Sequence, residues 1–205
     1  MASRHPQPPR RHPTPLFHGP YWLRTPRPEE LEAIFAGAAA QMPSYPEIGA
    51  TREATALPAG YHHVQASVDL GTGQEAFDRA CAALRVWAPQ RNAGIELLPA
   101  EPLLTPGQDL VLLFRTVPFH VTAACRIVYT IDDPDRYGFG YGTLPHHPEQ
   151  GEEAFLVERS PEGQVAFRIR AFSRPGQLLT RLGSPLGRAV QARVTQRYLS
   201  GMQHP

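Results

Sequence analysis

The stretch His120–Thr143, HVTAACRIVYTIDDPDRYGFGYGT, decides the fold. Its first half alternates apolar and polar residues, a pattern typical of a half-buried β-strand. The apolar positions, which alternation places on one face, are Val121, Ala123, Cys125, Ile127, Tyr129 and Ile131. Asp132-Asp133-Pro134-Asp135 has the composition of a turn, and a second alternating run starts at Tyr137. Because the connection is short, the two runs are predicted to be antiparallel neighbours.

The second run, Tyr137–Leu144, carries three glycines on one strand face. The opposite face carries Tyr137, Phe139, Tyr141 and Thr143. A glycine inside a strand costs about 0.5–1 kcal/mol, so three together need a physical reason. Either the strand bends sharply here, or another backbone or a ligand approaches the glycine face closely.

Similar runs lie on both sides of this hairpin. Further strands are predicted over Val64–Leu70, Gly94–Leu98, Leu110–Val117, Glu152–Arg159 and Gln164–Ser173. One helix, Gly73–Trp87, follows the first strand, and another starts at Ser184-Pro185 with an apolar stripe through Leu186, Val190, Val194 and Tyr198. This order predicts an α+β helix-grip (START-like) fold, in which a curved antiparallel sheet of about seven strands wraps around a long C-terminal helix.

The N-terminal segment differs in composition from the rest. Residues 1–28 hold eight prolines, five arginines and no acid, which predicts a disordered tail. An apolar stripe at helical spacing follows over residues 29–42. We therefore expect a single domain over 29–202, with an added N-terminal helix.

Overall composition narrows the function classes. The 205 residues carry a net charge of +1, which is no signature of a polyanion-binding protein. Two cysteines cannot build a disulfide framework, and no apolar run approaches the roughly 18 residues of a membrane span. We expect a cytoplasmic protein without a nucleic-acid partner, stable membrane insertion, metal or cofactor. The oligomeric state is left open.

The block 145–153, PHHPEQGEE, concentrates imidazoles and carboxylates. Adjacent histidines in an extended chain point in opposite directions, so the spacing does not favour a metal site. An arginine on a half-buried strand needs a partner, which predicts a polar cluster near the mouth of the domain. Its members would be Arg126, His147, Glu149, Glu152, Glu153 and Arg170. An acid–base alternative remains, with His147, Glu152 and Tyr141 as candidate catalytic residues.

Several segments resemble the uncharacterised family called domain of unknown function 1990. They are YPEIGAT (45–51), LGTGQEAF (70–77), CRIVY (125–129), GFGYGTLPHHPEQGEEAF (138–155), AFSRP (171–175), GSPL (183–186) and QRYL (196–199). His146 stands where glycine is expected in that family, which makes His147 the better candidate for a shared role. The resemblance implies a likeness to START and birch-pollen-allergen proteins, which usually hold an apolar ligand between the sheet and the last helix. Some members of that wider group are cyclases or hydrolases.

Together these features predict a binding module for a lipid-like or isoprenoid-like molecule, held in a cavity between the sheet and the C-terminal helix. The side chains expected to line it are Tyr129, Tyr137, Phe139, Tyr141, Thr143, Phe155, Phe167, Val190 and Val194. Two alternatives stay open. One is an enzyme of hydrolase, cyclase or isomerase type acting on an apolar substrate in the same cavity. The other is an interaction protein whose interior has no cavity.

Overall fold

The computed structural model describes residues 19–53, 56–115, 119–176 and 184–203, with the backbone alone described for 184–188. The elements in chain order are β1 (Tyr21–Trp22), α1 (Pro28–Ala38), β2 (His62–Thr72), α2 (Gly73–Arg85), α3 (Ala88–Asn92), β3 (Ile95–Leu98), β4 (Asp109–Arg115), β5 (His120–Asp133), β6 (Arg136–Thr143), β7 (Glu149–Arg159), β8 (Gln164–Pro175) and α5 (Ser184–Gln203).

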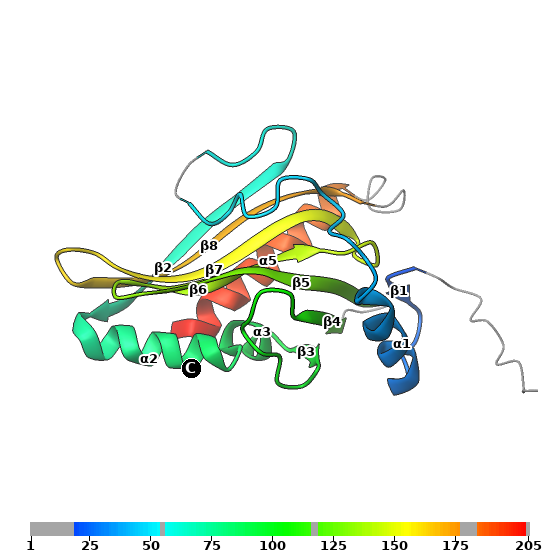
Figure 1. The fold of residues 1–205 in the computed structure, drawn as a ribbon, viewed down its shortest axis with the longest axis horizontal. Coiled ribbons are helices and arrows are strands. Elements are labelled where there is room, and N and C mark those ends of the chain that lie inside the picture. Colours follow the sequence, from blue (N-terminus) through cyan, green and yellow to red (C-terminus); the bar gives the residue numbers. More distant parts are fainter. Residues whose placement is uncertain (1–18, 54–55, 116–118, 177–183, 204–205) are drawn as a thin grey trace, which may run out of the picture.

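The strands form one antiparallel sheet in the order β2-β8-β7-β6-β5-β4-β3, and β1 pairs with β5 beside this path. The sheet is curved, and α2, α3 and α5 lie against its concave face (Figure 1). The segment between α1 and β2 crosses the opposite, convex face. This arrangement confirms the predicted helix-grip fold. We call the concave face the inner face and the convex face the outer face.

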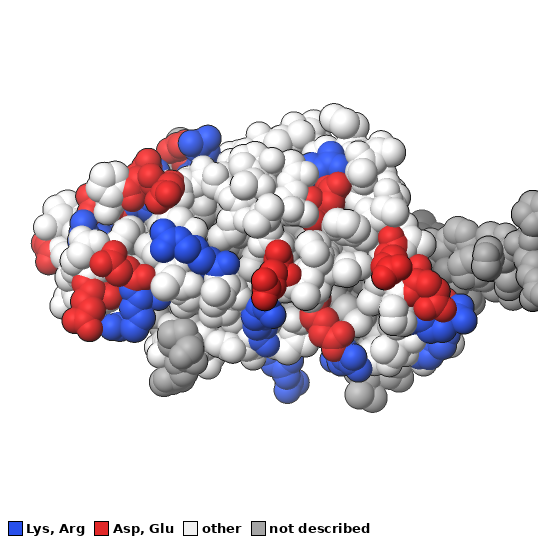
Figure 2. Space-filling model, turned by 60° about the horizontal axis from the view of Figure 1, so that its bottom comes forward, with Lys and Arg blue, Asp and Glu red and all other residues white. Residues whose placement is uncertain are grey.

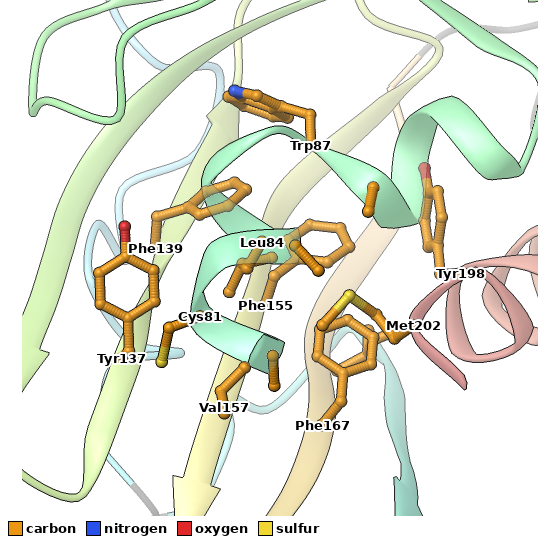
Figure 3. Close-up of a cluster of buried hydrophobic side chains, with 14 of the residues drawn as sticks. Cys81, Leu84, Trp87, Tyr137, Phe139, Phe155, Val157, Phe167, Tyr198 and Met202 are labelled. Carbon is orange, nitrogen blue, oxygen red and sulfur yellow. The ribbon is translucent and has the colours of Figure 1, made fainter. Parts of the chain in front are cut away.

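The main core lies on the inner face. The α2 stripe predicted from the sequence, with Phe77, Cys81 and Leu84, is buried against β6, β7 and β8. From α5, Tyr198 and Met202 reach the same cluster, so the last turns of α5 close the core (Figure 3). Burying large side chains of this kind stabilises a fold by about 1.5–3 kcal/mol each.

One prediction about the sheet was wrong. Tyr129 and Ile131 do not share a face with Cys125 and Ile127: the first pair belongs to an outer-face cluster, the second pair to the inner core. The pairing of β5 with β6 shifts register between Ile127 and Tyr129. A bulge adds one residue to the strand, so the side chains after it point to the other face.

The N-terminal region is more structured than expected where it is described. Trp22 in β1 is buried, and its indole Nε1 donates a hydrogen bond to Thr122 Oγ1 at 3.0 Å. Residues 21–22 of the predicted tail are therefore packed on β5, whereas residues 1–18 lie outside the described part of the chain. The added helix is present as α1 and ends at Ala38 rather than near residue 42.

Candidate functional site

The aromatic side chains expected to line a cavity fill the inner face instead. The rings of Phe139 and Phe155 stack with centroids 5.4 Å apart, and the Trp87 ring lies 4.7 Å from Phe139. Tyr198 meets Phe155 edge-on at 5.3 Å. Phe139, Phe155 and Phe167 are fully buried by these neighbours (Figure 3). These rings therefore pack directly on one another.

The sequence did not predict that the Trp87 side chain packs in the inner core against Phe139. Trp87 sits between α2 and α3 with a left-handed backbone (φ 61°), and its Nε1 donates a hydrogen bond to the carbonyl of Pro102. Both features turn the indole into the core at the point where α2 ends. Nothing in the local sequence around Trp87 predicts that turn, since the left-handed conformation is uncommon for a bulky residue.

Two hollows stand out elsewhere on the described surface. One of about 230 Å³ lies between the end of β2, α2 and the end of α5, beside Asp69, Arg79 and Met202. The other, of about 500 Å³, is a shallow depression between Asn92 and Arg197. None of the residues predicted to bind a ligand lines either hollow.

The inner face becomes polar where β7 begins and β8 ends, a region that we call the β7–β8 end of the sheet. Glu153 lies on this face opposite Tyr141 on the neighbouring strand, and the Tyr141 hydroxyl donates to Glu153 Oε2 at 2.8 Å. Burial raises the pKa of Glu153 to about 7, although the hydrogen bond from Tyr141 opposes the rise. Burial, followed by the charge of Glu153, also raises the pKa values of Tyr141 and Tyr198 well above their ordinary value.

Glu149 and His147 extend this polar end. Burial raises the pKa of Glu149, and Gln191 on α5 donates to Ser173 Oγ at 3.2 Å and lies 3.5 Å from Glu149 Oε2. The His147 Nδ1 accepts the backbone N–H of Glu149 at 2.9 Å. Burial lowers the pKa of His147 to about 4, so the ring is neutral at physiological pH. We call Tyr141, Glu149, Glu153, Ser173 and Gln191 the inner polar group.

Glu152, the next residue along β7, lies on the outer face in a different environment. Its carboxylate accepts four hydrogen bonds: from the Tyr45 hydroxyl (2.7 Å), the Gly49 N–H (2.7 Å), the Thr51 N–H (2.9 Å) and the Thr51 hydroxyl (2.5 Å). The Thr51 hydroxyl also lies 2.7 Å from the Tyr129 hydroxyl. The segment 45–51 is thus fastened to the sheet through one buried carboxylate. We call Glu152 and its partners Tyr45, Gly49 and Thr51 the outer latch.

The glycine row of β6 lies under the outer latch. A Cβ at Gly140 would come within 2.5 Å of the Tyr129 ring, and one at Gly142 would collide with Tyr45. Gly140 and Gly142 therefore leave room for the side chains of Tyr129 and Tyr45 to lie close against β6. Of the two predicted reasons for the row, close approach is the one observed, and the approaching group belongs to this chain rather than to a ligand.

The predicted polar cluster does not assemble as one unit. Arg126 pairs with Asp109 (2.6 Å) and donates to the carbonyls of Ala38 and Gln41, so it holds the end of α1 rather than the acidic block. Arg170 lies on the outer face of β8 and donates to the Glu53 carbonyl. The structure places Glu149 and Glu153 on the inner face, with His147 bonded to the backbone of Glu149, and leaves Glu152 on the outer face.

The predicted ligand-lining residues are divided in the same way. Tyr137, Phe139, Tyr141, Phe155 and Phe167 are on the inner face, and Val194 packs beside them. Val190 is 45% exposed. Thr143 Oγ1 accepts the Gly151 N–H at 3.0 Å, and Tyr129 lies on the outer face because of the β5 bulge.

Several residues of the two sites were missed in the sequence. Tyr45 and Thr51 were visible only as members of the YPEIGAT segment, without a role.

Gln90 on α3 is fully buried, and neither its amide oxygen nor its nitrogen has a hydrogen-bond partner among the described residues. In the same residues, no three histidine, cysteine, aspartate or glutamate side chains gather as they would around a metal ion.

Comparison with known proteins places the chain in a family. The family model described as a domain of unknown function, DUF1990, matches residues 44–201. This chain belongs to the DUF1990 family. A UPF0548 protein of Deinococcus radiodurans is 35% identical over 197 residues, covering 87% of this chain and 94% of the relative. A UPF0548 protein of Dictyostelium discoideum is 32% identical over 139 residues, covering 62% and 64%.

A solved structure, a hypothetical protein from Helicobacter pylori, aligns with a TM-score of 0.49 at 13% identity, covering 69% of this chain and 85% of its own. The family prediction made from the sequence is confirmed by the family model and by the relative from Deinococcus radiodurans. As for membranes, none of the helices in the described residues has the length and apolar character needed to span a bilayer.

Proposed function

We propose that residues 29–202 form one domain that binds a small, largely apolar molecule with a single polar group, at the β7–β8 end of the inner face and beside α5. The observation that carries the proposal is the Glu153–Tyr141 pair. A carboxyl with a pKa of about 7 and a phenol face inward where the aromatic packing ends. Partly desolvated groups of this kind at the edge of an apolar core are typical of binding and catalytic sites.

Small residues on the neighbouring strand positions and two valines of α5 are the apolar groups that we assign to the site. Ala171 lies opposite Glu153 on β8, and Gly151 lies two residues before Glu153 on β7. On α5, Val194 is half-buried and Val190 is 45% exposed. The apolar body of a lipid-like or isoprenoid-like molecule would contact these valines, while its polar group bonds to Glu153 or Tyr141. Of the residues predicted from the sequence to bind the ligand, this proposal retains Tyr141, Val190 and Val194.

The proposal also keeps a cytoplasmic location and the lack of a nucleic-acid partner. Two buried free thiols, Cys81 and Cys125, support a reducing compartment. On the face seen in Figure 2, basic and acidic side chains are interspersed, so that face has no extended positive surface of the kind that binds polyanions.

Native mass spectrometry of the protein purified from its own host tests the proposal. We expect a co-purified species of a few hundred daltons, together with uptake of oleate or farnesol by protein freed of it. Val190→Glu places a charge beside the proposed apolar body and should lower the uptake at least tenfold. Val86→Glu is the matched control, because Val86 is a 60% exposed valine outside the site. No bound species and no uptake of either probe would refute the binding function and favour the interaction protein.

A second function, acid–base catalysis in the same place, is favoured by one observation. The pKa of Glu153 is close to neutral, which suits a group that both gives and takes a proton. The other candidates are less suited, since the Glu152 carboxylate already accepts four hydrogen bonds and the His147 Nδ1 is occupied. If the domain is an enzyme, Glu153→Gln retains the ligand but stops its conversion, as followed by mass.

A further inference from the structure

The edge of the sheet formed by β2 is long and open. β2 has 11 residues and ends the strand order, with β8 as its partner on one side (Figure 1). None of its residues is fully buried. Near its C-terminal end, the Arg79 guanidinium of α2 lies 3.5 Å from the Leu70 carbonyl.

Sheet edges of this kind are usually protected. Short strands, prolines, bulges and charged side chains keep one edge from pairing with another. The opposite edge follows that rule, since β3 has four residues and Pro99 follows it. From His62 to Val68, β2 carries no proline, lysine, arginine or acid, and its register shift lies beyond Asp69. The free edge of β2 is therefore available for another strand.

The side chains along this edge are self-complementary. The residues pair across Ala66 as if it were a mirror point: Gln65 with Ser67, Val64 with Val68, and His63 with Asp69. The outer-face positions His63, Gln65, Ser67 and Asp69 are exposed, and the inner-face valines are half-buried. A strand with this pattern matches a second copy of itself running antiparallel.

We propose that two copies of this chain associate edge to edge through β2, antiparallel, about a two-fold axis at Ala66. A two-fold axis perpendicular to the sheet keeps each side chain on its own face, so each residue must face one that is an even number of positions away in the sequence. The axis therefore runs midway between the two copies of a single residue, here Ala66. With the axis at Ala66, each His63 faces the Asp69 of the other copy. An axis at Gln65 or Ser67 brings His63 opposite Ser67 or Gly71 and loses that polar pair.

The resulting interface is small and made mainly of backbone. Nine facing residues form ~8 inter-strand hydrogen bonds in the antiparallel pattern. The two sheets become continuous, and the half-buried Val64 and Val68 of one copy pack beside Val68 and Val64 of the other. An interface of this size gives a concentration-dependent dimer rather than an obligate one.

Sedimentation velocity of the full chain, from low to several hundred micromolar, measures the association. We expect the wild-type chain to shift from monomer to dimer as concentration rises. Ser67→Lys places a charge opposite Gln65 of the other copy and should weaken dimerisation at least tenfold. Gln164→Lys makes the same charge change at an exposed position of β8 and should leave it within threefold. A monomer at all concentrations, or a dimer insensitive to Ser67→Lys, would overturn the proposal.

Disulfide trapping checks the register. Ala66→Cys brings two thiols opposite each other across the axis, within the ~4.4–6.8 Å Cα separation of a disulfide. A cross-linked dimer should therefore form on mild oxidation. The native Cys81 and Cys125 should not compete, because both are buried. Gln65→Cys is the control, since its two copies lie diagonally about 7–8 Å apart. Cross-linking at 65 but not at 66 would exclude this register.

Discussion

Glu152 and Glu153 are neighbours in the chain, yet their carboxylates lie on opposite faces of the sheet and differ in hydrogen bonding and burial. On the outer face, Glu152 accepts four hydrogen bonds and fastens the segment 45–51. On the inner face, Glu153 accepts a hydrogen bond from Tyr141, and burial raises its pKa to about 7. The difference shows that two adjacent carboxylates of one acidic block can be hydrogen-bonded to saturation on one side of a strand and held with a raised pKa on the other.

The sharpest test of this contrast removes the outer carboxylate. Glu152→Ala leaves the buried Tyr45 hydroxyl and Thr51 N–H, and the partly buried Gly49 N–H, without their acceptor. Each unmet donor costs about 1–3 kcal/mol, so we expect the free energy of unfolding to fall by ~3–5 kcal/mol. Urea denaturation measures it. Glu158→Ala is the control on the same strand, because Glu158 makes surface ion pairs worth ~0–1 kcal/mol. Equal losses in the two variants would mean that the latch has no special weight.

The next largest effect is expected at the glycine row. Gly140→Ala puts a Cβ within 2.5 Å of the Tyr129 ring, which the Thr51 hydroxyl holds in place. Overpacking of this kind costs about 1–3 kcal/mol, and thermal melts should show the loss. Gly37→Ala in α1 is the counterpart, since a Cβ there meets nothing within 4 Å and alanine favours a helix by up to ~1 kcal/mol. Tyr129→Leu should relieve the clash; if it does not, the glycine is needed for strand curvature.

The order of elements could be predicted because alternation, turn residues and helix stripes are local signals. The faces of the strands were harder. The bulge between Ile127 and Tyr129 has no mark in the sequence, yet it moved Tyr129 from the expected cavity to the outer face. The acidic block could be found, but its partners could not, because Tyr45 and Thr51 lie about 100 residues away. The filled interior likewise depends on Trp87, whose left-handed backbone only the assembled fold reveals.

The inner carboxyl should make stability depend on pH. Because the pKa of Glu153 is raised to about 7 in the folded state, the native chain binds more protons than the unfolded chain between about pH 4.5 and 7. Its contribution is therefore present at low pH and lost as pH rises through 7. Glu153→Gln should match wild type near pH 4.5 and exceed it by ~1–2 kcal/mol at pH 8, a value discounted for partial solvent screening.

His147 has to be separated from this effect. Its pKa is lowered to about 4, so its contribution to stability rises with pH between about 4 and 6.5, opposite in sign to that of Glu153. The difference between wild type and Glu153→Gln at each pH cancels the histidine term. A difference that stays constant from pH 4.5 to 8 would show that Glu153 titrates as in the unfolded chain.

The smallest effect concerns Gln90, which extends the contrast to the helical layer. Every donor of the outer latch is matched, whereas the Gln90 amide on α3 is fully buried and has no hydrogen-bond partner among the described residues. Gln90→Met keeps the volume and removes both polar atoms, so stability should rise by about 1 kcal/mol in urea denaturation. Asn92→Ala, which removes the 2.9 Å hydrogen bond to the Gly201 carbonyl on α5, should change stability in the opposite direction. If Gln90→Met destabilises the protein instead, the amide has a buried polar partner such as an ordered water, and the inner layer is as well satisfied as the outer one.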